Sequence, residues 1–382
     1  MRKLCILISI SLLLIFLSGC WDYREIEDAT IVNIICLDRD EKTKEYILSI
    51  EVMDVKGLAQ GVDVSPQVIE ARGTSIIDAV RNLISVTTKV PYWSHVTMVI
   101  LSQDIAREGI VPVLDWIARS PELQLTLNIF VSKEKTAKEI LKSSQQLTMT
   151  RIFEYETISK AFRFLSKSPD VKANKVINEV QSKELYTVIP TVEMIKFDGG
   201  TYANFIGSSY FKEGKLEGFF SPIDTMKYLF VLNQVKGGDL VIPTDGNHEK
   251  VSLSIYKNTT KIKVDFIDDN IEINVNIKPI VSIAEIDGVV DYTSKEGRKM
   301  LKEKADIYLE NEIKSFIESV QKNPGIDVFN FGNKLKKRHP NLWKKIEKDW
   351  DQIFKEVSIE VNSDIRIKSS QHITTPIGAD TK

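Results

Sequence analysis

The chain has 382 residues, of which 43% are hydrophobic and 27% are charged, and its formal net charge is −2 at pH 7. This length and composition indicate a folded protein of two or three domains, each large enough to bury a core. The near balance of charge gives no electrostatic reason to bind nucleic acid or anionic lipid, so we expect neither ligand.

The first twenty residues have the features of a secretory signal. Arg2 and Lys3 precede an apolar run over residues 4–17, and Ser18 and Gly19 then lead to Cys20. The run is shorter than the ~20 residues needed to span ~30 Å of hydrocarbon. Acidic residues follow it, where a transmembrane anchor would show basic ones. We therefore predict a cleaved signal rather than a membrane-spanning helix. An ordinary signal peptide with a chance cysteine is the other alternative.

The segment Leu17-Ser18-Gly19-Cys20 resembles the lipobox of bacterial lipoproteins. The resemblance implies that residues 1–19 are removed and that Cys20, the new first residue, carries S-diacylglycerol and N-acyl groups. Two acyl chains give a stable anchor, because each buried CH₂ contributes about 0.8 kcal/mol. The expected mature protein carries 49 basic and 53 acidic residues, a net charge of −4. It would be tethered to the outer face of a membrane.

The three cysteines allow no disulfide within the expected mature chain. Cys5 leaves with the signal, Cys20 is acylated, and Cys36 remains alone in an apolar stretch over residues 31–37. Stability must then come from packed cores rather than from cross-links. We expect Cys36 to be a buried small hydrophobic residue, with a reactive thiol as the alternative.

Residues 20–195 are predicted to form an N-terminal α/β domain, because strands and helices alternate along them. A charged turn over residues 38–44 separates the first two strands, and Pro112 is expected to break or disturb a helix. The predicted strands are residues 29–37, 46–53, 67–71, 96–101 and 123–131. One predicted helix begins near residue 74, with residues 76, 77, 80, 83 and 84 on one face. The other predicted helices cover residues 103–119, 133–141 and 158–166.

Residues 196–258 are predicted to form a small middle α/β domain, and residues 259–370 a C-terminal domain with a long helix and a sheet. The expected middle elements are strands 203–211, 216–220, 240–243 and 251–257 and a helix over 225–233. The expected C-terminal elements are strands 261–265, 271–286 and 357–368, the long helix 295–321, and short helices 331–338 and 341–349. Residues 371–382 are a polar tail. The predicted fold class is mixed α/β, with mixed and antiparallel sheets and packed helices, behind a lipoprotein signal peptide.

The sequence shows no pattern typical of catalysis or of cofactor binding. Its four histidines are far apart, so we predict no zinc site; they are His95, His248, His339 and His372. There is no Gly-x-Ser-x-Gly nucleophile motif, no glycine-rich phosphate loop and no EF-hand. His95 beside Trp93 could be a site residue, although an ordinary turn residue is the simpler interpretation. We therefore predict neither an enzyme nor a cofactor.

Two C-terminal features have a structural and a functional interpretation. The basic run over residues 334–339 predicts a solvated helix face, or else a surface for an anion or acidic partner. Packing of short helices against the last strand explains the nearby aromatic residues without a ligand. These residues are Phe329, Phe331, Trp343, Trp350 and Phe354.

Several segments are similar to the Ger(x)C lipoproteins, the C subunits of bacterial spore germinant receptors. The most specific is Gly19-Cys20-Trp21-Asp22 with Glu25-Ile26. The other segments are Ala71-Arg72-Gly73-Thr74, Trp93-Ser94-His95, residues 114–119, residues 207–218, residues 327–332 and His339-Pro340-Asn341-Leu342-Trp343. The similarity extends from Cys20 to near Ile367.

This resemblance implies a three-domain ectodomain on the outer face of the spore inner membrane. It implies a non-catalytic accessory or scaffold role beside an integral-membrane A-type subunit and a B-type transporter-like subunit, in a receptor that triggers germination by nutrients. The alternative function is a solute-binding lipoprotein that delivers a ligand to a membrane transporter. A surface hydrolase is disfavoured because no nucleophile and base are paired in the sequence.

Overall fold

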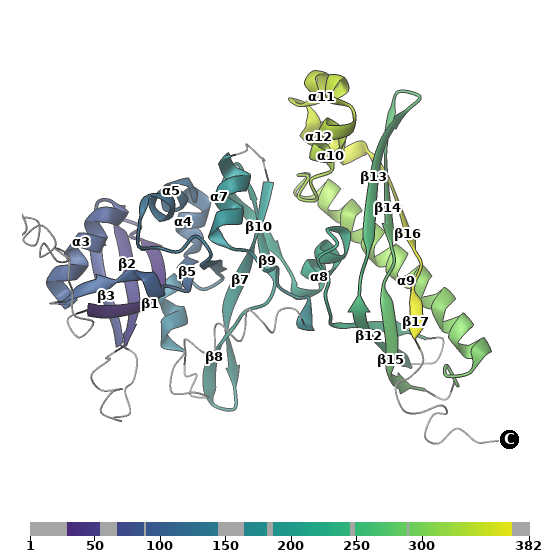
Figure 1. The fold of residues 1–382 in the computed structure, drawn as a ribbon, viewed down its shortest axis with the longest axis horizontal. Coiled ribbons are helices and arrows are strands. Elements are labelled where there is room, and N and C mark those ends of the chain that lie inside the picture. Colours follow the sequence, from purple (N-terminus) through teal and green to yellow (C-terminus); the bar gives the residue numbers. More distant parts are fainter. Residues whose placement is uncertain are drawn as a thin grey trace, which may run out of the picture.

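The computed structural model describes residues 29–53, 67–87, 89–143, 164–181, 186–244, 249–288 and 290–368. These residues form an elongated molecule with an N-terminal part built on one large sheet (Figure 1). The C-terminal part is built on two smaller sheets and a long helix, and the helix α8 (Pro222–Val231) lies between the two parts. The prediction of a mixed α/β fold with several sheets is confirmed.

The N-terminal sheet has ten strands in a mixed arrangement. Its main path is β10-β9-β7-β6-β5-β1-β2-β3, with β4 added to β1 and β8 added to β7. The central strands β1, β5, β6 and β7 are parallel, while both ends of the sheet are antiparallel. The strands are β1 (Ala29–Arg39), β2 (Tyr46–Met53), β3 (Gln67–Gly73), β4 (Val90–Tyr92), β5 (Met98–Leu101), β6 (Asn128–Ser132), β7 (Tyr186–Phe197), β8 (Gly200–Asn204), β9 (Ser208–Lys212) and β10 (Lys215–Phe220).

Both faces of this sheet are covered, which explains why its central strands are apolar along their whole length. Ile35 and Leu37 of β1 pack in the larger core, against the helices visible in front of the sheet in Figure 1. Ile34 and Cys36 point to the other face and share a smaller core with the 3₁₀ helix η3 (Ala137–Lys142). The helices of the larger core are α3 (Ile76–Thr87), α4 (Gln103–Glu108), α5 (Val111–Arg119) and α7 (Ala173–Gln181).

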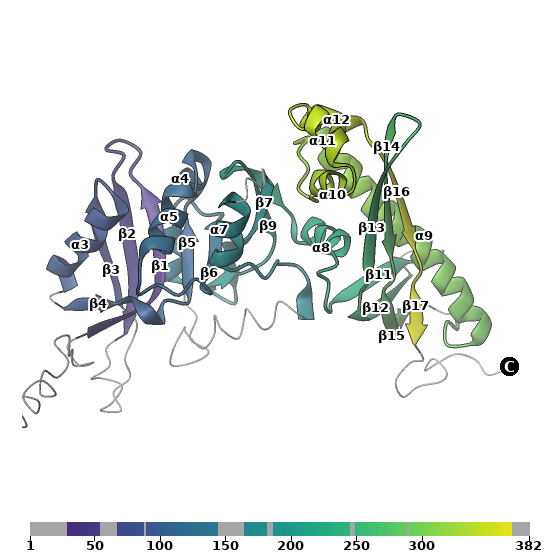
Figure 2. The same cartoon turned by 45° about the horizontal axis from the view of Figure 1, so that its top comes forward.

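The C-terminal part contains three long ribbons, each broken once. One sheet has the order β11-β12-β15-β17 and the other β13-β14-β16. Consecutive strands of the two sheets are separated by only two residues, and Figure 2 shows them running on from one another. The strands are β11 (Asp239–Pro243), β12 (Lys250–Lys257), β13 (Thr260–Ile267), β14 (Asn270–Ile277), β15 (Ile280–Asp287), β16 (Ser358–Ser363) and β17 (Arg366–Lys368).

The breaks correct two predicted strands, because residues 271–286 and 357–368 each form two strands in different sheets. Pro279 has no N–H to donate to a ladder, and its carbonyl instead accepts from Arg366 N–H at 2.9 Å. At the third ribbon, Asp306 of the long helix accepts from Ile365 N–H at 2.7 Å, so the break is held by a side chain. These contacts are distant in sequence, which is why strand periodicity alone does not reveal the breaks.

The helix α9 (Lys295–Lys322) is the long helix of the C-terminal part and packs against its sheets. Ser294 caps its first turn by accepting from Gly297 N–H at 3.0 Å. Its buried stripe, at spacings of three and four, packs against the broken ribbons; the stripe is Leu301, Ala305, Leu309, Ile313, Phe316, Ile317 and Val320. The predicted helix over 295–321 is therefore confirmed to within one residue.

Three short helices follow α9, where two were predicted. They are α10 (Phe331–Arg338), α11 (Pro340–Ile346) and α12 (Trp350–Glu356). Asp351 of α12 joins this part to the N-terminal sheet, since it pairs with Lys212 of β9 at 2.6 Å and accepts from the hydroxyl of Tyr186 of β7. The two parts are thus connected by an ion pair as well as by α8.

Other predictions differ in detail from the structure. The strand predicted over 123–131 is β6 alone, because residues 121–126 form turns, and the helix predicted over 103–119 divides into α4 and α5 before Pro112. Strands of the predicted middle segment, residues 196–258, are shared between sheets: β8 to β10 extend the N-terminal sheet, whereas β11 and β12 pair in the C-terminal one. Residues 158–163 of a predicted helix lie outside the described residues.

Candidate functional site

The predicted acylation site Cys20 lies outside the described residues, but the structure shows where the described chain begins, nine residues later. The first described residue, Ala29, pairs in parallel with Val90 at the start of β4. Cys20 and Ala29 are nine residues apart, and a fully extended chain of that length spans about 30 Å. A membrane anchor on Cys20 would therefore keep β4 and its surroundings within about 30 Å of the lipid.

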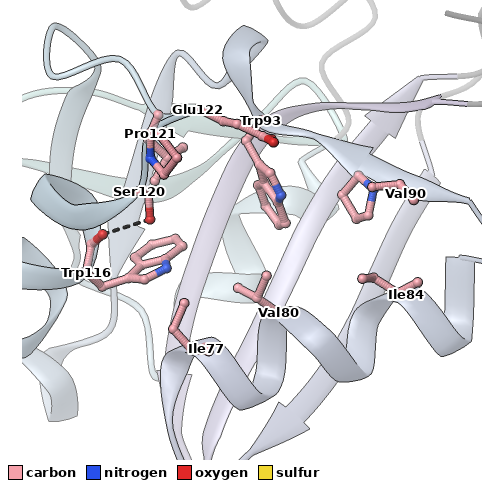
Figure 3. A pocket seen from close by; sticks show the side chains of 11 residues that line it. Ile77, Val80, Ile84, Val90, Trp93, Trp116, Ser120, Pro121 and Glu122 are labelled. Carbon is pink, nitrogen blue, oxygen red and sulfur yellow. Dashed lines mark hydrogen bonds between the residues drawn. The ribbon is translucent and has the colours of Figure 1, made fainter. Parts of the chain in front are cut away.

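Beside β4 lies an apolar groove, bounded on one side by α3 and on the other by the end of α5 and the turn after it. Ile77, Val80 and Ile84 of α3 point toward Trp93 and Val90 (Figure 3). Trp116, Pro121 and Leu123 line the opposite side, and the space enclosed is about 200 Å³. A second hollow of about 350 Å³ adjoins it and shares Ile77, Trp116, Ser120 and Pro121. The two hollows are together called here the α3–α5 groove.

Local hydrogen bonds hold the walls of the groove. The Ser120 hydroxyl donates to the carbonyl of Trp116 at 2.8 Å, which fixes the turn after α5 (Figure 3). Gln124 donates its side-chain amide to the carbonyl of Ser94 at 3.0 Å and so ties that turn to the segment after β4. These bonds place the two tryptophans that flank the groove.

The other wall depends on a close approach between β3 and α3. At Gly73 a Cβ atom would lie 2.2 Å from the backbone nitrogen of Ala79, so any side chain there would push the helix away. The first turn of α3 is capped by the Ser75 hydroxyl, which accepts from Asp78 N–H at 3.1 Å. Glycine at this position thus allows β3 and α3 to pack closely against one another.

The apolar surface of α3 is wider than the core requires. Ile76, Ala79 and Leu83 face the sheet and are buried. Ile77 and Ile84 remain 46% and 41% exposed and face the groove. The prediction placed these apolar residues on one face of the helix; in the structure Ile76 and Leu83 of that face meet the sheet, while Ile77 and Ile84 line the groove. Val90, Tyr92 and Val86, which are 43%, 43% and 55% exposed, extend the apolar surface nearby.

The groove can bind apolar side chains but has few groups for chemistry. Its polar lining consists of Ser120 and Glu122, and the adjoining hollow adds Tyr46, Ser75 and the Asp115–Arg119 pair, whose side chains lie 2.8 Å apart. His95, considered as a site residue, lies exposed in the 3₁₀ turn η2 (Trp93–His95), with its ring near that of Tyr92. Within the described ranges, His, Cys, Asp and Glu side chains form no group that could hold a metal ion. Among the helices that are described, none is long and apolar enough to cross a bilayer.

The C-terminal aromatic residues surround a buried carboxylate. Asp327 accepts from the N–H groups of Phe331 and Gly332 at 3.1 and 2.7 Å and from the Trp350 indole N–H at 3.0 Å. Burial raises the pKa of this carboxyl to about 7, although the hydrogen bonds oppose the rise. The prediction that packing explains these aromatic residues agrees with their burial. Asp327 joins α10 to α12 and is best understood as a structural centre.

The basic run over 334–339 lies on α10 and just beyond it. Lys334, Lys336 and Lys337 are exposed, as expected for a solvated helix face, while Arg338 pairs with Asp265 of β13 at 2.6 Å. The imidazole Nε2 of His339 is buried and makes no hydrogen bond within the described part of the chain. One residue of the run, Arg338, therefore helps to attach α10 to β13. His248 and His372 lie outside the described residues.

Two further predicted positions are buried in the smaller core. Cys36 is fully buried, as predicted, and burial raises the pKa of its thiol well above the ordinary value. Asp38, expected in a charged turn, is instead buried and accepts from the N–H groups of Ala137 and Lys138 at 2.6 and 3.1 Å. Desolvation raises its pKa to about 6. It caps η3, a role that depends on residues about a hundred positions away.

A separate polar cavity of about 250 Å³ lies between the start of α7 and the end of α8. It is lined by Ser166, Ser168, Asp170, Lys175, Leu229, Gln234 and Lys236. The hydroxyl of Ser168 is buried and has no hydrogen-bond partner among the described residues. This cavity could accept a small polar molecule or water.

Sequence reasoning missed the α3–α5 groove, although one signal for it was present. Residues 76–86 carry apolar side chains on more positions than a single buried stripe uses. The position of Trp93 and Trp116 on opposite sides of the same groove could not be predicted, because it depends on how the turn after α5 meets the segment after β4.

Comparison with known proteins gives a consistent result over nearly the whole chain. Residues 22–194 match the family described as "Spore germination protein N-terminal domain". Residues 206–371 match the family described as "Spore germination B3/ GerAC like, C-terminal". The two matches together begin two residues after Cys20 and end three residues beyond β17.

Full-length relatives are found in Bacillus subtilis (strain 168). Spore germination protein KC is 22% identical, with 98% of each chain covered. Spore germination protein B3 is also 22% identical, over 93% of this chain and 95% of the relative. The crystal structure of the GerBC protein has the same fold, with a TM-score of 0.59 at 19% identity, over 87% of this chain and 96% of that one.

Proposed function

The chain belongs to the Ger(x)C family of spore germination proteins, and from this we propose that it is the lipid-tethered subunit of a nutrient germinant receptor. In this proposal it is not an enzyme and acts as an accessory or scaffold component. The observation that carries the proposal is the pair of family matches, which together extend over both parts of the fold. They begin at residue 22, next to the predicted acylated Cys20.

The proposed mechanism is positional. Acyl chains on Cys20 hold the folded body on the outer face of the spore inner membrane. Tethering replaces free diffusion by a local search and so raises the effective concentration of the body near its partners. The proposed partners are the integral-membrane A-type and B-type subunits of the receptor. The surface nearest the membrane would be the one around β4, because the tether begins there.

The Cys20→Ala variant tests the tether. Without the acyl chains, we expect the protein to leave the inner-membrane fraction of spores and nutrient-triggered germination to slow or fail. Cys36→Ala is a matched control that removes a different cysteine, which is buried on β1 and lies outside the tether. It should retain membrane association. Normal retention and normal germination in the Cys20→Ala spores would show that the tether is not needed.

The alternative of a solute-binding lipoprotein has one observation in its favour, the polar cavity with the unpartnered hydroxyl of Ser168. Isothermal titration of the protein with amino acids and sugars distinguishes the two functions. Saturable tight binding that is lost in Ser168→Val would favour solute binding. The scaffold proposal predicts no such heat.

A further inference from the structure

We propose that the α3–α5 groove is the docking site for the chain's own N-terminal segment, residues 21–28, with the side chains of Trp21 and Tyr23 between α3 and the groove tryptophans. The proposal adds an internal contact to the tether and does not depend on the receptor role. It needs only that the chain begins at or before residue 20.

The first support is where the segment ends. Ala29 pairs with Val90, and Val90 lines the groove. Ala29, which directly follows the segment, therefore lies at the edge of the groove, so the segment would need no long connection to enter it. Tyr23 is six residues from Ala29 and Trp21 is eight, which allows them to reach about 20 and about 28 Å from that point.

The second support is chemical fit. In an extended chain, residues two apart point to the same side, so Trp21 and Tyr23 would present two aromatic rings to one surface. The groove offers apolar side chains and Trp93 and Trp116 as partners. A buried aromatic side chain typically covers about 150–250 Å² of surface. The two hollows of the groove enclose about 200 and about 350 Å³, so each ring has a separate hollow available.

The third support is charge. Residues 22–28 contain four acidic residues and one basic residue, a net charge of −3. Exposed Arg81 lies on the same stripe of α3 as Ile77 and Ile84, at spacings of four and three. Arg81 favours an acidic segment near α3, whereas Glu122 opposes one at the other wall, where Asp115 is already paired with Arg119.

The ionisable side chains that line the groove argue against a lipid occupant. Asp115, Arg119 and Glu122 line one end of the groove, and burying such groups in hydrocarbon is costly.

Docking of residues 21–28 would also have a consequence for the tether. Only the bond from Cys20 to Trp21 would separate the anchor from the folded surface. The folded body would then have a fixed orientation at the membrane, instead of being held by an extended tether of about 30 Å.

Amide hydrogen exchange tests the proposal in the mature chain, residues 20–382, carrying Cys20→Ala. The variant with Trp21→Ala and Tyr23→Ala should exchange about ten-fold or more faster in α3 and in residues 120–123, because the removed rings no longer cover them. Phe197→Ala, which removes an aromatic side chain that is 71% exposed on β7, is the matched control and should leave α3 unchanged.

A second variant tests the groove from the other side. Ile84→Asp changes a side chain that is 41% exposed, so the fold should be retained. It should accelerate exchange in α3 as much as the double variant does, and combining the two should add little. A Tyr23→Cys and Ile84→Cys pair should form a disulfide at least ten-fold faster than Tyr23→Cys with Phe197→Cys.

Three results would overturn the proposal. The first is equal exchange in α3 with and without the two aromatic residues. The second is protection of α3 only when the acylated protein is in lipid nanodiscs, which would identify the membrane as the occupant. The third is protection only in a complex purified with other membrane proteins, which would identify a partner protein.

Discussion

Removal of the buried carboxylate of Asp327 is expected to destabilise the C-terminal part strongly. In Asp327→Ala, the N–H groups of Phe331, Gly332 and Trp350 lose their common acceptor in a buried setting. Each buried donor left unpaired costs about 1–3 kcal/mol. Burial of the carboxyl itself already has a cost, which its raised pKa reflects, and this offsets part of the loss. We expect the free energy of unfolding to fall by about 3 kcal/mol.

Urea unfolding measures this loss, with tryptophan fluorescence as the signal because Trp343 and Trp350 are buried beside Asp327. Hydrogen exchange of α10 and α12 shows whether the loss is local. Asp104→Ala, which removes an exposed carboxylate from the first turn of α4, is the control and should change the free energy by about 0.5 kcal/mol or less. An unchanged urea midpoint in Asp327→Ala would refute the structural role assigned to this carboxylate.

Three further predictions concern buried groups. The pKa of Asp327 is raised to about 7 when folded, against about 3.9 when unfolded. The folded state therefore binds the proton more tightly, and the stability that this group contributes near pH 4 should be lost as the pH rises to 7. Melting curves from pH 4 to 8 should show this component in the wild type and not in Asp327→Asn; identical pH profiles would contradict it. Gly332→Ala should lower the free energy of unfolding, measured in urea, by about 1–3 kcal/mol, because the new Cβ would lie 2.7 Å from atoms of Trp343 and Trp350. An unchanged urea midpoint would show that the two rings can move aside without cost. The buried thiol of Cys36 should react with a thiol reagent only after unfolding, and rapid labelling of Cys36 itself in folded mature protein that carries Cys20→Ala would disprove its burial.

Much of the element order follows from local patterns. Alternation predicted β2 and the apolar stripe predicted α9, because each depends on residues that are close in sequence. The breaks in the C-terminal ribbons could not be predicted in this way. They depend on Pro279 meeting Arg366 and on Asp306 meeting Ile365, pairs that are 87 and 59 residues apart.

The candidate site was predictable only in part. Acylation of Cys20 stays a prediction from a linear motif, while the family resemblance was read from segments spread between Cys20 and Ile367. The groove depends on tertiary packing, since Ile77 and Ile84 look like core residues until the structure shows which stripe of α3 meets the sheet. Asp38 and Asp327 likewise appear as ordinary acidic residues until their distant backbone partners are known.

The most direct test of the proposed receptor role is purification of the tagged protein from the inner membranes of dormant spores. The proposal predicts that a multi-span A-type subunit and a transporter-like B-type subunit copurify with it, and that the Cys20→Ala variant recovers much less of both. Mass spectrometry of the purified complex identifies the copurifying proteins and the modification on Cys20. Recovery of the protein alone from those membranes, with Cys20 acylated and no integral-membrane partner, would contradict the proposal.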